Sequence, residues 1–541
     1  MPEEVPQRRI DRADPASAGE EEPARHPSAS DPIDAGSVHA PTLDPTSQPR
    51  DTDGVAGRVR TGLKWGAADQ VFQQVLRISL TVVLTRLTPP SEFGLIAMGF
   101  LVTTAASWIS DLGFGSALVQ RRTIGQRHIG TALTSTAVIG LVLAAATCLA
   151  APSLADYFAE DRLALVLIVL SVNFPIKGLA GIPRDLLRRE LRFKEFALAA
   201  GVSVVVSATT ALVLAVNGAG VWALVAYSVV ESVVALFAFA WFAQRRLGHR
   251  LRLAFGREEF SDLAGFGASV AANRLVFYLQ SNVDNLIVAK ALGAVALGLY
   301  GLAYRIMLYP IQKVADVIVS VAMPAFSTLQ DDRDAMRAGY LRGQQFICLV
   351  CFPASVGIAV SAPLLIPVLV GDQWLAAVAT VQILALSGPR IALNRLNGSV
   401  FQACGRPERD LQITLVAFAL VVPALVVGSR TGIEGVAVAY TTVGWLLVPL
   451  GLVPAARRIG TTARHAVRPL WTIALATIAM AATSELSRRS LTGEVSDLLA
   501  LAVVVVVGAV TYLVTLVVVD RALLAGVLSQ VTRPRVRSAP C

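Results

Sequence analysis

Charged side chains are scarce along this chain of 541 residues. Only 16% of the residues are Asp, Glu, Lys or Arg, whereas 54% are hydrophobic and the mean hydropathy is +0.61. Soluble globular proteins carry about 25% charged residues. The shortage of charge excludes an ordinary soluble domain and predicts a polytopic integral membrane protein.

Histidine and cysteine are also few, and their positions exclude several kinds of site. The five histidines lie outside the apolar stretches, which excludes a zinc site or a histidine proton relay inside the membrane. Cys348 and Cys351 form a lone CxxC within an apolar stretch, and no cysteine falls in a loop expected outside, so no disulfide framework is expected. The motif GxxxxGK[ST] is absent, which excludes a P-loop nucleotide-binding domain. We therefore expect no cofactor.

Long apolar runs are abundant. Stretches of about 20 apolar residues have the length of a membrane-spanning helix. Their number predicts an all-α protein with about fourteen spans, and an even number places both termini on the same side. The predicted spans are residues 66–87, 93–118, 129–150, 162–182, 196–216, 220–243, 266–290, 298–322, 343–370, 376–401, 411–428, 433–455, 468–486 and 497–519.

Basic residues in the loops indicate the orientation. The loops and C-terminal tail on the side of the termini hold 26 Arg and Lys residues, whereas the opposite loops hold five. Cytoplasmic loops are enriched in Lys and Arg, so both termini are expected in the cytoplasm of a bacterial cell, with the chain multi-pass in the inner membrane. The short opposite loops leave no extracytoplasmic domain for chemistry. We therefore expect a protein that is not an enzyme.

A weak internal repeat suggests two lobes. Residues 85–95 resemble residues 289–299, with Phe93-Gly94-Leu95 matching Leu297-Gly298-Leu299 at an offset of 204 residues. A repeat of six spans keeps its orientation, as in transporters whose halves are related by an axis along the membrane normal. The expected organisation is a disordered cytoplasmic tail (1–60), an N-lobe of spans 1–6 (61–243), a cytoplasmic linker (244–265), a C-lobe of spans 7–12 (266–455), spans 13 and 14 (456–519) and a basic cytoplasmic tail (520–541).

Polar residues follow one face of the first predicted span. Asp69, Gln73, Gln74, Arg77 and Thr81 recur at helical spacing between apolar residues. A charge at the centre of a membrane helix costs about 2.5–3.5 kcal/mol on insertion scales. Such a stripe is therefore expected to face the protein interior or a water-filled cavity.

Basic residues outnumber acids within the predicted spans, where seven cations face five carboxylates. They could be interhelical ion pairs, or they could line a substrate route. The excess favours an anionic cargo, because arginine can bind a phosphate group through two hydrogen bonds. The predicted cavity residues are Gln73, Gln74, Arg77, Lys177, Arg274, Asp284, Asn285, Arg305, Arg390, Asn394 and Arg395, and the candidates for ion coupling are Asp69, Glu231 and Asp284.

Several motifs resemble those of a known family. They are LTRLTPPSEFGLIAMG (84–99), DLGFGSALVQRR (111–122), LLRRELRFKEFA (186–197), GAGVWALVAY (218–227), SNVDNLIVAKALGAVALGLYGLAYRI (281–306), MPAFSTLQDD (323–332), GDQWLAA (371–377) and QACGRPERD (402–410). In this order they resemble bacterial polysaccharide and O-antigen (Wzx-like) flippases, in the lipopolysaccharide and exopolysaccharide branch of the multidrug/oligosaccharidyl-lipid/polysaccharide exporter superfamily. The resemblance covers about residues 58–455.

The resemblance implies a two-lobed helical fold with a cationic central cavity. It also implies flipping of an undecaprenyl-pyrophosphate-linked oligosaccharide by alternating access, coupled to an ion such as H⁺ or Na⁺. The implied partners are this lipid-linked oligosaccharide, the bilayer and a polysaccharide polymerase or glycosyltransferase machinery, with no nucleic acid. The alternatives are a flippase for a lipid II-type peptidoglycan precursor, a multidrug or cation antiporter, and a membrane glycosyltransferase or polymerase.

Overall fold

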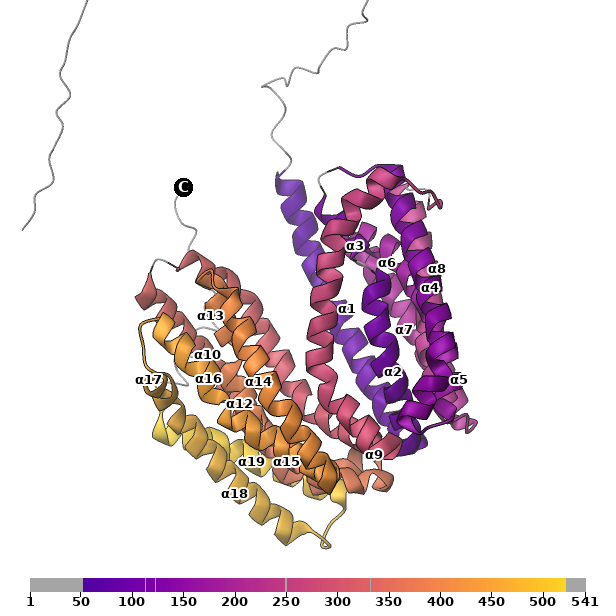
Figure 1. Cartoon of the computed structure of the whole chain (residues 1–541). Coiled ribbons are helices and arrows are strands. Elements are labelled where there is room, and N and C mark those ends of the chain that lie inside the picture. Colours follow the sequence, from indigo (N-terminus) through magenta and orange to yellow (C-terminus); the bar gives the residue numbers. More distant parts are fainter. Residues whose placement is uncertain (1–51, 112, 122, 249–250, 331, 522–541) are drawn as a thin grey trace, which may run out of the picture. The chain divides into compact units, whose positions relative to one another are not determined.

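The computed structural model describes residues 52–521, apart from residues 112, 122, 249, 250 and 331, and the described part is built of helices (Figure 1). Of the expected tails, residues 1–51 and 522–541 lie outside these residues, whereas residues 52–60 belong to the first helix and not to a disordered tail. The first eight helices are α1 (Thr52–Leu87), α2 (Pro90–Asp111), α3 (Phe114–Gln120), α4 (Gln126–Phe158), α5 (Arg162–Ser171), α6 (Asn173–Arg189), α7 (Phe193–Val216) and α8 (Val221–Leu247).

The second part of the chain begins with a very long helix. The elements that follow α8 are α9 (Arg257–Thr328), α10 (Arg333–Val370), the 3₁₀ helix η1 (Asp372–Ala377), α11 (Val378–Ala385), α12 (Gly388–Asn394), α13 (Asn397–Ala403), α14 (Pro407–Gly428), the 3₁₀ helix η2 (Ser429–Thr431), α15 (Ile433–Leu446), α16 (Val448–Arg458), α17 (Ala463–Val467), the 3₁₀ helix η3 (Arg468–Leu470), α18 (Trp471–Leu491) and α19 (Asp497–Val519).

The predicted number of fourteen spans is not confirmed. Within the described residues, twelve helical segments are long and apolar enough to cross a membrane. One of them, Ala271–Thr328, joins most of the predicted span 266–290 to the predicted span 298–322 across the non-helical residue Gly293. Helix α1 is not among the twelve, since its polar stripe interrupts the apolar sequence.

Helix α9 folds back at Gly293. This residue has φ 82° and ψ −173°, a conformation that is open to glycine and strained for side chains with a Cβ. The kink divides α9 into a first half, Arg257–Leu292, and a second half, Gly293–Thr328. The first half packs along α2, α3 and α4, where Leu263 joins a small apolar core with Phe114 and Ile129.

Helix α2 and the second half of α9 touch backbone to backbone. A Cβ on Gly94 would lie 1.6 Å from the Ala294 carbonyl oxygen, and a Cβ on Gly298 would lie 2.1 Å from the Pro90 carbonyl oxygen. These two contacts are equivalent under the internal repeat, because Gly94 and Pro90 correspond to Gly298 and Ala294 at the offset of 204 residues. The contact therefore has the two-fold character expected where the two repeats meet.

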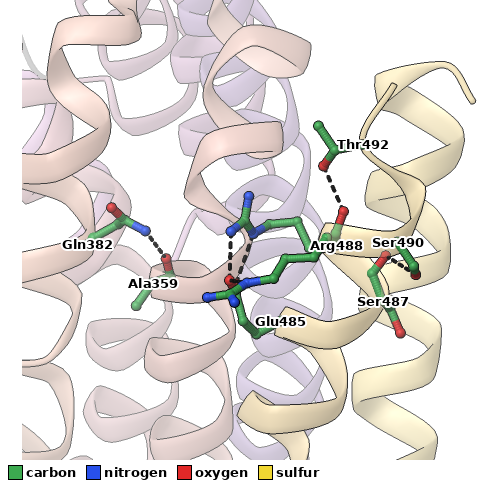
Figure 2. Close-up of polar contacts among 8 residues, drawn as sticks. Ala359, Gln382, Glu485, Ser487, Arg488, Ser490 and Thr492 are labelled. Atoms are coloured by element: carbon green, nitrogen blue, oxygen red, sulfur yellow. Dashed lines mark hydrogen bonds and ion pairs between the residues drawn. The ribbon is translucent and has the colours of Figure 1, made fainter. Parts of the chain in front are cut away.

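The last two long helices cover α10. The Tyr512 hydroxyl of α19 donates to the Leu349 carbonyl of α10 at 2.7 Å, and Met480 of α18 joins the main core. Near the C-terminal end of α18, Glu485 accepts hydrogen bonds from Arg488 at 2.7 and 2.9 Å and from Arg489 at 2.6 Å (Figure 2). These two arginines are thus held by one carboxylate on their own helix.

Candidate functional site

A central cavity of about 640 Å³ lies between α1, α2, both halves of α9 and the end of α10. Its polar lining is contributed mainly by α1 and α9, and Leu101, Leu297 and Leu308 are among its apolar residues. The polar residues are Gln74, Arg77, Thr81, Tyr278, Asn282, Asn285, Tyr304, Arg305, Tyr309 and Gln312.

Arg305 is the cation of the central cavity without a partner in the protein. Within the described part of the chain it forms neither a hydrogen bond nor an ion pair, and its side chain is exposed in the cavity. Asn285 lies close by on the first half of α9 and donates to Asn282 at 3.4 Å. None of the described lining residues is a carboxylate, so the cavity has a positive charge.

A second cavity of about 540 Å³ lies between α1, α6, α7 and α8, and we call it the N-lobe chamber. Both oxygens of Asp69 accept from the Gln73 amide, at 2.8 and 2.9 Å. The charged and polar residues of its lining are Asp69, Gln70, Gln73, Gln74, Arg77, Lys177, Arg184, Arg188, Ser203, Glu231 and Ser232.

Arg77 lines both cavities. Its guanidinium group donates to Glu231 of α8 at 2.6 Å, and its side chain is 44% exposed. Gln74 is likewise shared between the two linings. The cavities therefore meet at the polar face of α1, which the sequence placed toward the protein interior.

The predicted cavity and coupling residues separate into two groups. The structure brings eight of them into the two cavities, namely Asp69, Gln73, Gln74, Arg77, Lys177, Glu231, Asn285 and Arg305. The other five, Arg274, Asp284, Arg390, Asn394 and Arg395, are not among the lining residues of either cavity.

Protein contacts account for several residues of the second group. Arg395 forms an ion pair with Asp316 at 2.5 Å, and Arg390 lies over the Tyr440 ring at 4.5 Å. Arg274 stacks on Trp108 at 5.1 Å. The side-chain oxygen of Asn394 accepts a hydrogen bond from the Asn397 amide at 2.8 Å.

Asp284 is buried away from both cavities. Its carboxylate accepts a hydrogen bond from the Tyr300 hydroxyl at 3.0 Å, and the residue is 4% exposed. Tyr300 in turn stacks on Tyr304, which lines the central cavity. In the described residues no cluster of three or more His, Cys, Asp or Glu side chains could hold a metal ion.

Sequence analysis missed Arg184 and Arg188 as cavity residues. Both were assigned to a cytoplasmic loop, but α6 continues to Arg189 and carries them into the N-lobe chamber. The sequence contained a signal for them, because Arg184 lies two helical turns after Lys177 and Arg188 one turn after Arg184. This spacing places the three side chains on one face of a helix.

Beside Leu369 and Val370, which line one end of the central cavity, lies a set of polar contacts that we call the latch. The indole of Trp374 donates to the Thr85 carbonyl at 2.8 Å, and the Gln373 amide donates to the same oxygen at 2.6 Å. Arg86 donates to the Val368 and Leu369 carbonyls at the end of α10. The latch thus joins the end of α1 to the segment between α10 and α11.

Solved structures with a similar fold support the two-lobed architecture. The inward closed conformation of the lipid II flippase MurJ superposes with a TM-score of 0.66 at 13% identity, covering 85% of this chain and 99% of that one. An inward-facing multidrug resistance MATE family transporter of the MOP superfamily gives a TM-score of 0.56 at 17% identity, covering 72% and 94%. The expected all-α fold with MATE-like lobes is confirmed.

Relatives in sequence are proteins of polysaccharide biosynthesis. The lipopolysaccharide biosynthesis protein WzxC of Escherichia coli (strain K12) is 27% identical over 395 residues, which is 72% of this chain and 78% of the relative. The teichuronic acid biosynthesis protein TuaB of Bacillus subtilis (strain 168) is 26% identical over 356 residues, or 65% and 73%. The family model described as polysaccharide biosynthesis protein matches residues 83–379, more than half of the chain. By this match, the chain belongs to the polysaccharide biosynthesis protein family.

Proposed function

We propose that this protein flips an oligosaccharide linked to undecaprenyl pyrophosphate across the bacterial cytoplasmic membrane, for synthesis of a surface polysaccharide. The observation that carries the proposal is the central cavity, in which Arg305 has no partner among the described residues and no described lining residue is acidic. A diphosphate that joins a lipid to a sugar is a compact anion. Guanidinium groups bind such anions through paired, charge-assisted hydrogen bonds.

The lining of the central cavity disfavours a multidrug or cation antiporter. A cationic cargo would need a carboxylate to balance its charge in this cavity, because a cation beside unpaired arginine is repelled. The cavity holds two arginines and, among its described lining, no acid. A lipid II-type precursor carries the same diphosphate linkage, so it remains the second candidate cargo.

Transport proceeds by alternating access in this proposal. The arginine asymmetry of the loops supports an orientation with both termini in the cytoplasm. The latch then lies on the extracytoplasmic side, and the cargo enters from the cytoplasm. Opening the latch while the cytoplasmic side closes would release the cargo into the outer leaflet. No catalytic step is required.

An ion gradient is the proposed energy source, with H⁺ or Na⁺ as the coupling ion. Glu231 is placed to couple ion binding to cargo binding, because its carboxylate holds Arg77 at 2.6 Å. Occupation of Glu231 by a cation would free Arg77 for the cargo. Asp69 in the N-lobe chamber and the buried Asp284 are the other candidate carboxylates.

The proposal is tested by replacing Arg305. Purified protein is reconstituted into liposomes that contain a fluorescent polyprenyl-diphosphate oligosaccharide, and flipping is measured by an impermeant quencher. Arg305→Ala is expected to reduce flipping at least tenfold, whereas Arg305→Lys retains part of it. Lys313→Ala is the matched control, since Lys313 lies on the same half-helix over Tyr309 and outside both linings. Wild-type flipping by Arg305→Ala contradicts the proposal.

A further inference from the structure

We infer that the N-lobe chamber is a second anion-binding site, which receives the diphosphate headgroup of the cargo before the central cavity does. This inference rests on the proposed function. It separates a loading site from the central cavity and assigns Arg77 to the transfer between them.

The chamber has a line of basic side chains along α6. Lys177, Arg184 and Arg188 are separated by seven and four residues, so they project from one face of the helix. Arg188 lies in the last turn of α6, and Lys177 lies about three turns earlier. The line therefore leads from the helix end, at the cytoplasmic surface in the proposed orientation, toward the level of Arg77.

The two arginines are fixed by a shared carboxylate. Arg184 donates to Asp185 at 3.1 and 3.4 Å, and Arg188 lies 3.7 Å from the same carboxylate, which is buried with 8% of its side chain exposed. The shared carboxylate gives both guanidinium groups a defined position in the lining of the chamber. Guanidinium groups held in this way are suited to charge-assisted hydrogen bonds with an anion.

Lys177 is the cation of the chamber that is available to a ligand. Its side chain is exposed in the cavity, and it forms no ion pair with the described residues. Arg77, in contrast, is paired with Glu231. The acid Asp69 is held by the Gln73 amide rather than by a cation.

Cations outnumber carboxylates in the described lining of the two cavities. The two linings contain five cations, Arg77, Lys177, Arg184, Arg188 and Arg305. Among the described residues, the carboxylates that line the cavities or pair with these cations are Asp69, Asp185 and Glu231. The excess of basic groups favours an anionic headgroup such as a diphosphate.

Arg77 can serve both sites because it stands at their boundary. It lines each cavity, and its side chain is 44% exposed despite the pair with Glu231. A headgroup held by Lys177 and Arg184 would reach Arg77 next and Arg305 last. The order of binding is therefore chamber, Arg77, central cavity.

The test places one reporter cysteine in each cavity of the full-length protein in nanodiscs. In a background whose five native cysteines are replaced, Ala200→Cys reports on the N-lobe chamber and Gly301→Cys on the central cavity. Position 301 has open space for a side chain. Labelling by a maleimide is timed with increasing inorganic pyrophosphate, with chloride at equal ionic strength as the control.

Pyrophosphate is expected to slow labelling at both positions. Lys177→Gln should raise the concentration that protects position 200 by about tenfold and leave position 301 unchanged. Arg305→Gln should raise the concentration that protects position 301 and leave position 200 unchanged. Arg77→Gln should raise the protective concentration at both positions, and Lys313→Gln should change it at neither. Gel filtration of each variant checks that it is folded.

Two outcomes separate this inference from the proposed function. If pyrophosphate never protects position 200, or Lys177→Gln leaves that protection unchanged, the proposal of a loading site is contradicted. The proposed role of the central cavity is not affected by this outcome. If pyrophosphate does not protect position 301 and Arg305→Ala flips the lipid at the wild-type rate, the proposed function is contradicted. The loading site, which depends on that function, is then contradicted as well.

Discussion

Glu92 joins three helices through one carboxylate. Its two oxygens accept from Arg162 at 2.8 and 2.9 Å, and one of them also accepts from the backbone N–H of Val221 at 2.8 Å. Val221 is the first residue of α8, where backbone N–H groups have no partner within the helix. Glu92 of α2 therefore caps α8 and fixes the start of α5.

Replacing Glu92 should cost more stability than replacing its arginine partner. Glu92→Ala leaves the N–H of Val221 unsatisfied and removes a negative charge from a helix N-terminus, a loss of about 1–3 kcal/mol. Arg162 is 56% exposed, so Arg162→Ala should cost no more than about 1 kcal/mol. Thermal unfolding of the purified protein compares the two. Equal losses of stability in the two variants would show that Glu92 stabilises the protein through its ion pair with Arg162 and not through the cap of α8.

Individual side chains show what sequence patterns can and cannot predict about the site. The polar face of α1 follows from helical spacing, and the structure places Gln73, Gln74 and Arg77 in the cavities. The pairing of Arg395 with Asp316 could not be predicted, because 79 residues separate them. A single sequence records which charges lie within the spans, but not which of them neutralise one another.

Among the helices, the crossing of α2 with the second half of α9 leaves no room for a side chain. Gly94→Ala would place a methyl group 1.6 Å from a backbone oxygen, so the two helices must move apart. Overpacking of this kind costs about 1–3 kcal/mol or more. We expect a lower unfolding temperature for Gly94→Ala and for Gly298→Ala, measured in the same detergent.

Gly265→Ala is the control for these glycine variants. Gly265 lies on α9 as well, and a Cβ there would meet no atom within 4 Å. The control should unfold at the wild-type temperature or slightly above it, since alanine favours the helix. An unchanged unfolding temperature for both Gly94→Ala and Gly298→Ala would contradict the close crossing.

Helix ends were harder to predict than helices. Apolar length located the spans, but it ended the fourth at residue 182, whereas α6 runs on to Arg189. In a sequence, arginines in a loop at the membrane surface cannot be distinguished from arginines in the last turns of a helix. The break between residues 290 and 298 was expected as a loop, yet Gly293 alone provides the turn, because glycine can adopt a positive φ.

For the whole molecule, the internal repeat predicted two related halves, and the structure shows where they meet. The contact of Gly94 with Ala294 and that of Gly298 with Pro90 are repeat equivalents. In the latch, Arg86 of α1 donates to carbonyl groups of α10, and Trp374 donates to a carbonyl group of α1. Lys290, the repeat equivalent of Arg86, likewise donates to the Tyr157 carbonyl. Sequence similarity between the halves relates such side chains to one another, but it does not show which carbonyl groups they reach.

In the proposed orientation, the latch should control access to the central cavity from the extracytoplasmic side. Trp374 is fully buried, donates to the Thr85 carbonyl and packs edge-on against Phe93 at 5.4 Å. Trp374→Phe removes the hydrogen bond while keeping an aromatic ring, and Gln373→Ala removes the second donor to the same oxygen. Each lost bond is worth about 0.5–1.5 kcal/mol, so the double variant should shift the balance toward the outward-open state by roughly tenfold.

The shift is measured by labelling Gly301→Cys in intact cells with an impermeant maleimide. Labelling should be faster in Trp374→Phe than in the parent and fastest in the double variant, because the closed state then has fewer bonds to break. Trp222→Phe is the control, since Trp222 is the second residue of α8 and takes no part in the latch. If the double variant is labelled at the parental rate, the latch contacts do not hold the closed state, and closure must depend on the α2–α9 crossing alone.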